Sequence, residues 1–164
     1  MSVRQPLLWA SAHDLLPDVL RPTLLRRLGI RIPNSALIRS GLRIIGDGTA
    51  TIGSGAFLNH DCLLETADEI TIGERVSFGY GVMIMTSAHD IEDPSHRAGP
   101  WRVAPVKIGA GAWLGAGVTV MSGVTIGPGA VIGAGSIVTH DCAANGLYLG
   151  TPARWVKDLP TTGK

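Results

Sequence analysis

The stretch from Ile108 to Thr139 reads IGAGAWLGAGVTVMSGVTIGPGAVIGAGSIVT and repeats every six residues. Each unit begins with an apolar residue, and a small residue follows four positions later. The same phase extends toward the N-terminus and defines fifteen hexapeptides in all. Their apolar positions are Ile32, Ile38, Ile44, Ile52, Leu58, Leu64, Ile72, Phe78, Ile84, Ile108, Leu114, Val120, Ile126, Ile132 and Val138.

This six-residue period fits neither an α-helix, which repeats about every 3.6 residues, nor a single strand, which repeats every two. It fits short strands joined by tight turns that stack coil upon coil. Three units would form one triangular coil with the apolar residues inside, so the repeat predicts a mainly β chain, a parallel β-helix of about five coils. The insertions that interrupt the repeat all follow a third unit, which places them at one corner. Glycines such as Gly115 and Gly133 follow the apolar residue in several units, and we expect them to adopt backbone angles that a Cβ would resist.

The segments outside the repeat predict a helical cap, a flap and a C-terminal piece. In residues 1–31 leucines recur at helical spacing, which predicts one or two short helices over the open end of the β-helix. The β-helix itself is expected over residues 32–142. Within it, residues 89–107 form a polar stretch with three prolines and no period, and we interpret this long loop as a flap over a site. Residues 143–164 are expected to form a last strand, a short helix over residues 154–159 and a tail.

The charge is small overall but unevenly distributed. The formal net charge is +1, which gives no reason to expect nucleic-acid binding. The first 43 residues nevertheless contain seven arginines and two aspartates, a local net charge of +5. Arg21, Arg26 and Arg27 beside leucines would form a basic amphipathic face, so a weak contact with a membrane surface is the alternative to a purely structural cap. Without an apolar run of roughly 20 residues, we expect a cytoplasmic protein, with the inner face of the membrane as the alternative place.

Few side chains offer catalytic chemistry. Cys62 and Cys142 occupy small-residue positions of the repeat, so we expect both to be buried rather than reactive. His89 stands where the rigid repeat meets the long loop, and its imidazole can accept a proton near neutral pH. We therefore predict that His89 is a general base. The sequence contains none of the common nucleophile or metal motifs, and no metal is expected.

The chain resembles the hexapeptide-repeat acyltransferases of left-handed parallel β-helix fold, and within them the maltose, galactoside and capsular-polysaccharide O-acetyltransferases. About two thirds of the chain carries this resemblance, in LNHDC (58–62), TSAHDIEDPS (86–95), PVKIGAGAWLGAGVTVMSGVTIG (105–127), IGAGSIVTHD (132–141) and GTPAR (150–154). The resemblance implies a homotrimer that binds acetyl-CoA between neighbouring subunits. The implied reaction is the acetylation of a hydroxyl of a saccharide or polysaccharide precursor, by direct attack on the thioester.

The resemblance also implies roles for single residues. His89 matches the general base and Asn59 an acceptor-binding asparagine, although a turn asparagine with local hydrogen bonds is the other interpretation of Asn59. Trp113 matches a tryptophan near the coenzyme, with a packing role as the alternative, and Gly115 and Gly133 belong to the same implied coenzyme-binding surface. Two cations, Arg154 and Lys157, would pair with the coenzyme phosphates. Thr66 departs from the family, because sugar acetyltransferases often carry an acceptor-binding aspartate there.

Three other functions compete with this one. An N-acetyltransferase of the same fold would act on an aminosugar. A metal enzyme of the γ-carbonic anhydrase kind would need three histidines to converge across a subunit boundary, and His60, His89 and His96 are available. In a non-catalytic scaffold, His89 would have no chemical role and the coenzyme would not bind.

Overall fold

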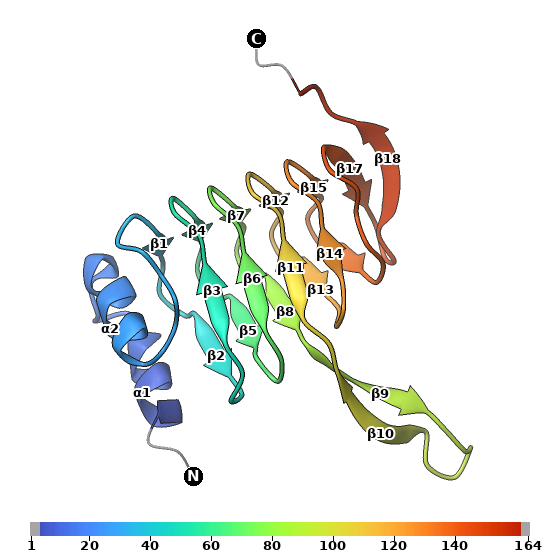
Figure 1. The fold of residues 1–164 in the computed structure, drawn as a ribbon, viewed down its shortest axis with the longest axis horizontal. Helices are drawn as coiled ribbons and strands as arrows, with labels where there is room; N and C mark the ends of the chain where they lie inside the picture. Colours follow the sequence, from blue (N-terminus) through green and yellow to red (C-terminus); the bar gives the residue numbers. More distant parts are fainter. Residues whose placement is uncertain (1–3, 162–164) are drawn as a thin grey trace.

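The computed structural model describes residues 4–161, which form a left-handed parallel β-helix with three faces (Figure 1). Face 1 consists of β3 (Ala50–Ile52), β6 (Ile70–Ile72), β11 (Val106–Ile108) and β14 (Thr125–Ile126). Face 2 consists of β1 (Leu37–Ile38), β4 (Phe57–Leu58), β7 (Ser77–Phe78), β12 (Trp113–Leu114), β15 (Val131–Ile132) and β17 (Gly146–Leu149). Face 3 consists of β2 (Arg43–Ile45), β5 (Leu63–Glu65), β8 (Met83–Met85), β13 (Thr119–Val120) and β16 (Ile137–Val138). Strands within a face pair in parallel, each with its counterpart one coil away.

The β-helix has about six turns, whereas the repeat predicts about five. Face 2 contains six parallel strands, and isolated bridges from Arg31 to Thr51 and from Ile126 to Cys142 extend face 1 at both ends. Cys142 follows Val138 by only four positions, so the six-residue phase is broken there although the chain continues to coil. Cys142 then returns to the ladder, and Tyr148 pairs with Ile132 six residues later.

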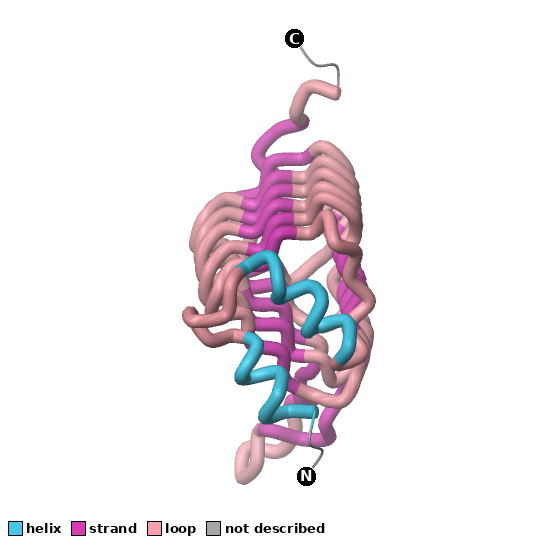
Figure 2. The backbone as a smooth tube through the Cα atoms, turned by 90° about the vertical axis from the view of Figure 1, so that its left-hand side faces the viewer, coloured by secondary structure: helices cyan, strands magenta, loops and turns pink. Residues whose placement is uncertain are grey.

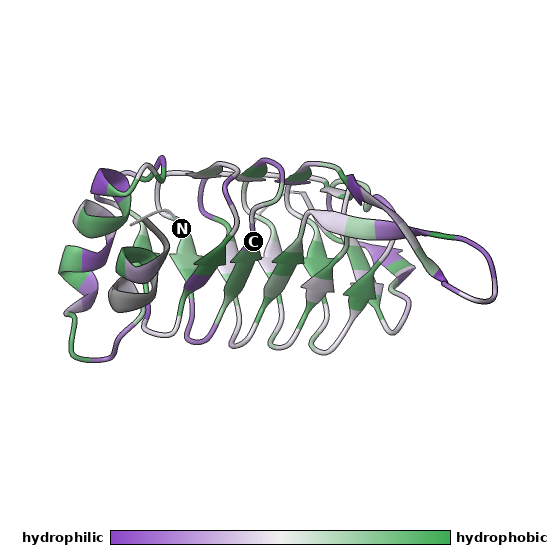
Figure 3. Ribbon diagram, turned by 90° about the horizontal axis from the view of Figure 1, so that it is seen from below, coloured by the Kyte–Doolittle hydropathy of each residue, from purple (hydrophilic) through white to green (hydrophobic). Residues whose placement is uncertain are grey.

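The apolar positions of the repeat form the core. All fifteen side chains are buried, with at most 5% of their surface exposed. In Figure 3 the strands of the coils carry mostly hydrophobic colours, whereas the tip of the hairpin that leaves the coils is hydrophilic. The small-residue positions, such as Val82, Ala112 and Val118, are buried as well. Burial of both sets stabilises the coils, because hydrophobic stabilisation grows with the apolar area removed from water.

The glycines after the apolar residues are required for a different reason from the one expected. Gly115 and Gly133 do not have positive φ angles. Instead, a Cβ on Gly115 would lie 2.6 Å from the backbone nitrogen of Ala134, in the next coil. Positive φ occurs two positions later, as at Gly117 (φ 69°), where a Cβ would meet nothing within 4 Å. Asp61 occupies the equivalent corner of an earlier coil with φ 62°, so that corner accepts a side chain.

We expect Gly115→Ala to destabilise the protein by about 3 kcal/mol, because the added methyl group collides with backbone atoms that cannot move independently. Gly117→Asn should cost no more than about 1 kcal/mol, since asparagine tolerates the left-handed region and the space is open. Denaturant midpoints of the two variants measure this difference. Equal midpoints would contradict the assignment of close coil packing to Gly115.

Two short helices and one turn of 3₁₀ helix cover the first coil, as predicted for residues 1–31. These are α1 (Arg4–Ser11), η1 (Asp18–Leu20) and α2 (Arg21–Arg27), and in Figure 2 both α-helices lie across the near end of the stack. Arg21 is 1% exposed and donates hydrogen bonds to the carbonyls of Ser11, His13 and Leu16. It therefore joins the pieces of the cap and does not contribute to the expected basic surface. No helix within residues 4–161 has the length and apolarity to cross a membrane.

The structure differs from expectation at both segments that leave the coils. The 89–107 stretch is an ordered antiparallel hairpin, β9 (Ser87–Ile91) with β10 (Ala98–Val103), which projects from the corner between faces 3 and 1 (Figure 1). The helix predicted over residues 154–159 is wrong, because β18 (Arg154–Asp158) forms instead and pairs antiparallel with β17. A final sheet edge exposes unpaired backbone groups, and a strand satisfies them where a helix could not.

Candidate active site

His89 is the middle residue of β9 and is exposed to solvent. Its Nδ1 is 2.8 Å from the carbonyl oxygen of Gly99 on the returning strand. A carbonyl oxygen can only accept, so Nδ1 carries the proton and the lone pair of the neutral ring is on Nε2. Because no hydrogen-bond partner of Nε2 occurs among residues 4–161, this nitrogen is open to an incoming ligand. The hairpin therefore fixes the tautomer of neutral His89, with Nε2 as the unprotonated nitrogen.

A partly buried polar network holds the base of the hairpin. The Glu65 carboxylate accepts hydrogen bonds from the backbone N–H groups of Thr86 (2.7 Å) and Ser87 (3.0 Å). The Thr86 carbonyl in turn accepts a 2.8 Å hydrogen bond from the hydroxyl of Ser122, one coil further on. These contacts tie the start of β9 to the coils on both sides, and so restrict the position of His89.

The outer end of the hairpin is closed by its own hydrogen bonds. Asp93 accepts from both the backbone N–H (2.9 Å) and the hydroxyl (2.7 Å) of Ser95. These two bonds lower the pKa of the Asp93 carboxyl below its ordinary value. Further in, the Arg102 guanidinium pairs with Asp90 across the strands at 2.6 Å. The hairpin is therefore a structured arm rather than a loose flap.

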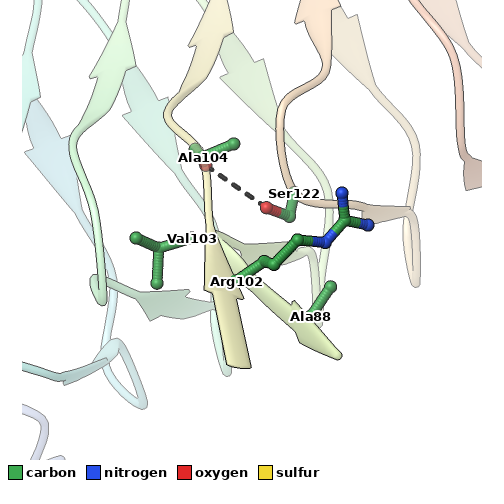
Figure 4. A pocket seen from close by; sticks show the side chains of 5 residues that line it. All are labelled: Ala88, Arg102, Val103, Ala104 and Ser122. Carbon is green, nitrogen blue, oxygen red and sulfur yellow. Dashed lines mark hydrogen bonds between the residues drawn. The ribbon is translucent and has the colours of Figure 1, made fainter. Parts of the chain in front are cut away.

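A small pocket of about 140 Å³ lies at the hairpin base. It is lined by Ala88, Arg102, Val103, Ala104 and Ser122, and Figure 4 shows the Arg102 side chain extending past Ser122 and Ala88. Ala88 immediately precedes His89 on a strand, so their side chains point to opposite faces of the hairpin. The pocket therefore lies behind the imidazole and not beside Nε2.

Three of the other predicted site residues lie along the corner between faces 2 and 3. Asn59 follows β4, Gly115 follows β12 and Gly133 follows β15, so the three residues occupy equivalent positions of successive coils, with Gly79 between the first two. The Asn59 side-chain oxygen accepts the backbone N–H of His60 at 2.9 Å. Its amide nitrogen then remains as the donor that the side chain can offer to a ligand.

The remaining predicted residues, Trp113, Arg154 and Lys157, lie on face 2 or on the strand that extends it. Trp113 is on face 2, two residues before Gly115, and is 56% exposed. Arg154 pairs with Leu149 and Lys157 with Leu147 in the β17–β18 ladder at the end of face 2, and both cations are exposed. Sheet spacing places β12 and β18 three strands apart, roughly 14 Å. Trp113 and the two cations therefore lie along an extended surface rather than in one pocket.

His89 is not brought together with Asn59 in one chain. The hairpin leaves the corner between faces 3 and 1, whereas Asn59 lies at the corner between faces 2 and 3. Figure 1 shows the hairpin projecting away from β4, the strand that Asn59 follows. The two side chains therefore lie at different corners of one β-helix.

Three further side chains considered in the sequence analysis, those of Thr66, Cys62 and Cys142, are buried. Thr66 is fully buried, and its hydroxyl donates to the Ile45 carbonyl at 3.1 Å, so this position holds a corner of the coil.

Cys62 and Cys142 are both buried and form no disulfide, as predicted, and burial raises the pKa of each thiol to about 11. Within residues 4–161, no three His, Cys, Asp or Glu side chains are grouped in the manner of metal ligands.

Sequence reasoning missed the hairpin residues around His89, namely Trp101 and the Arg102–Asp90 pair. A signal was present, because Ile91, Trp101 and Val103 alternate with Asp90 and Arg102 around a turn that contains Asp93 and Pro94. Such alternation on either side of a turn is typical of a hairpin.

The comparisons with known proteins agree with this architecture. The family model described as bacterial transferase hexapeptide (six repeats) matches residues 105–140. Nodulation protein L of Rhizobium meliloti strain 1021 is 35% identical over 130 residues, which are 71% of this chain and 71% of that protein.

Solved structures match over nearly the whole chain. A hexapeptide-repeat-containing acetyltransferase from Vibrio cholerae superposes with a TM-score of 0.84 and 25% identity, over 96% of this chain and 89% of that one. It has also been solved in complex with acetyl coenzyme A. A maltose O-acetyltransferase from Clostridium difficile 630 superposes with a TM-score of 0.76 and 30% identity, over 96% and 84%. By its repeat, its fold and these matches, the chain belongs to the hexapeptide-repeat acyltransferase family.

Proposed function

We propose that the protein transfers the acetyl group of acetyl-CoA to a hydroxyl of a saccharide or polysaccharide precursor. The observation that carries this proposal is the hydrogen bond from Nδ1 of His89 to the Gly99 carbonyl, which leaves Nε2 as an open base. A hydroxyl has a pKa far above 7 and is a poor nucleophile, so it needs a base at the moment of attack. The maltose O-acetyltransferase of similar structure supports an acceptor hydroxyl on a sugar.

The reaction can proceed without an enzyme-bound acyl group. Nε2 of His89 would take the hydroxyl proton as the oxygen attacks the thioester carbonyl. Collapse of the tetrahedral intermediate would form the ester and expel the coenzyme thiolate, which recovers the proton from the imidazolium. The buried cysteines, with thiol pKa values of about 11, are poor candidates for a covalent intermediate at neutral pH.

The site would form between subunits of a homotrimer. One subunit would contribute the hairpin with His89, and its neighbour would contribute the corner with Asn59. Threefold rings bring unlike surfaces of identical subunits together, which is what two separated half-sites require. The Asn59 amide would donate to an acceptor hydroxyl.

The coenzyme would lie along Trp113, Gly115 and Gly133, with its phosphates toward Arg154 and Lys157. An exposed guanidinium such as that of Arg154 matches phosphate geometry. Neither glycine adds a side chain of its own to this corner, although the Leu149 side chain packs against Gly133. The N–H groups of the two glycines donate to the Ile132 and Tyr148 carbonyls of the next coil.

The proposal is tested with a panel of acceptors and acetyl-CoA, with release of free thiol as the measurement. The panel should contain glucose, maltose, galactosides, an oligosaccharide, a lipid-linked sugar and a 4-aminosugar. Because the family's acceptor-binding aspartate is replaced by the buried Thr66, we expect poor affinity for free monosaccharides and faster turnover with the oligosaccharide or lipid-linked sugar. An aminosugar that outpaces every hydroxyl acceptor would instead identify an N-acetyltransferase.

A further inference from the structure

Trp101 is the residue directly opposite His89 in the β9–β10 hairpin. Paired residues of adjacent strands project to the same face, with their Cβ atoms about 5 Å apart. The Trp101 side chain is 60% exposed, so most of the indole surface is available beside the imidazole. The function proposed above does not use this indole.

The surroundings of Trp101 on this face of the hairpin are apolar. Ile91, two residues after His89 on the same strand, is 85% exposed, and Val103, two residues after Trp101, is 41% exposed. The charged pair Asp90 and Arg102 alternates with them and lies on the opposite face. The face of the hairpin that carries His89 is therefore mainly apolar around this one imidazole.

We propose that Trp101 is the ring platform of the acceptor site, which holds the sugar ring of the acceptor beside Nε2 of His89. This inference rests on the proposed function. A pyranose has an apolar face of C–H groups and a rim of hydroxyls, and such a face packs well on a flat aromatic ring. With the sugar seated on the indole, its rim hydroxyls point sideways across the hairpin.

The register makes this arrangement suitable for catalysis. His89 is the cross-strand neighbour of Trp101, and its ring is held by Gly99, two residues before Trp101. A hydroxyl on the rim of the seated sugar would therefore approach Nε2 from the side, while the indole excludes water from one face of the acceptor. Trp101 is thus a positioning residue that favours cyclic acceptors over small acyclic alcohols.

The test compares Trp101→Phe, which keeps a flat ring, with Trp101→Leu, which keeps an apolar side chain without one. We expect Trp101→Leu to raise KM for the saccharide acceptor by about tenfold, and Trp101→Phe to restore most of the loss. Two readouts should not change in either variant: the affinity for acetyl-CoA in a titration, because Trp101 is not among the residues assigned to the coenzyme, and the mass of the oligomer by light scattering. Saturation-transfer NMR with the acceptor should show the C–H face of the sugar in contact with the wild-type protein and a weaker contact with Trp101→Leu.

The outcomes separate the inference from the proposed function. If the wild-type protein acetylates a saccharide and Trp101→Leu has an unchanged KM, the ring platform is wrong and the proposed function stands. The same holds if Trp101→Leu dissociates the oligomer, because Trp101 would then pack between subunits. If the wild-type protein acetylates no saccharide in the panel, the proposed function fails, and the inference fails with it.

Discussion

We expect His89→Ala to lower kcat by about a hundredfold or more, with little change in affinity for acetyl-CoA, as the loss of a general base predicts. The side chain is exposed and its one described hydrogen bond is to the Gly99 carbonyl of the neighbouring strand. Removal of the imidazole should therefore leave the coils intact. Steady-state kinetics with the best acceptor of the panel, together with a coenzyme titration, provide the measurement.

Two further variants show whether the base itself is responsible. His89→Gln can still donate a hydrogen bond to Gly99 but cannot take a proton, so we expect its kcat to fall as far as that of the alanine variant. His96→Ala is the matched control, because His96 is another exposed histidine of the same hairpin, near its outer turn. Near-normal turnover in His89→Ala, or an equal loss in His96→Ala, would show that another group is the base.

The second large effect is expected from mixed oligomers of two inactive variants. If each site takes His89 from one subunit and Asn59 from the next, His89→Ala and Asn59→Ala subunits lack different halves of the site. A mixed trimer has two subunits of one variant and one of the other. Whichever variant is in excess, one of its three sites then combines an intact His89 with an intact Asn59. Mixed trimers should therefore regain about one third of wild-type activity, although each parent alone is nearly inactive.

The two variants can be co-expressed with different affinity tags and purified on both in succession, which leaves only mixed oligomers. As a control, each variant is co-expressed with a differently tagged copy of the same variant and purified in the same way. The activity of this control should stay as low as that of the single variant. Absence of recovery in the mixed oligomers, or a fully active monomer by light scattering, would contradict a site shared between subunits. The Trp101 variants are independent of this result, because Trp101 and His89 belong to the same hairpin.

Most of the fold could be predicted from the sequence because the contacts of a solenoid repeat at nearly constant separation. Thr51 pairs with Thr71 on the next coil, and Leu63 with Met83, so each pair is twenty residues apart. One hexapeptide pattern therefore specifies which residues form a strand, on which face the strand lies and which side chains are buried. The pattern held across the hairpin insertion, where Val106 still pairs with Ile70. It failed where the six-residue phase is lost, at the short step from Val138 to Cys142 and after Leu149, where β18 replaces the expected helix.

The candidate site could be predicted only in part. His89 was identified from its place at the end of a coil, and Asn59, Trp113, Gly115, Gly133, Arg154 and Lys157 from a family resemblance; their roles remain predictions. The sequence could not indicate which nitrogen of His89 is free, since that depends on the Gly99 carbonyl, ten residues away across a hairpin. The sequence also could not indicate that Trp101 lies opposite His89, because the cross-strand register depends on a turn and a bulge.

By itself, the sequence determined the three-faced β-helix, its buried apolar positions and the corner at which the insertions leave it, because these follow from local periodicity and burial. The repeat also predicts that His89 and Asn59 occupy different corners of one subunit, because Asn59 belongs to a second hexapeptide and His89 follows a third. Only the tertiary structure decided that the long insertion is a hairpin and that Trp101 lies opposite His89. The physical reason is the range of the interactions. Periodicity specifies what each residue meets on the next coil, whereas the site depends on strand pairing, ring orientation and corner geometry, which exist only once the whole chain is folded.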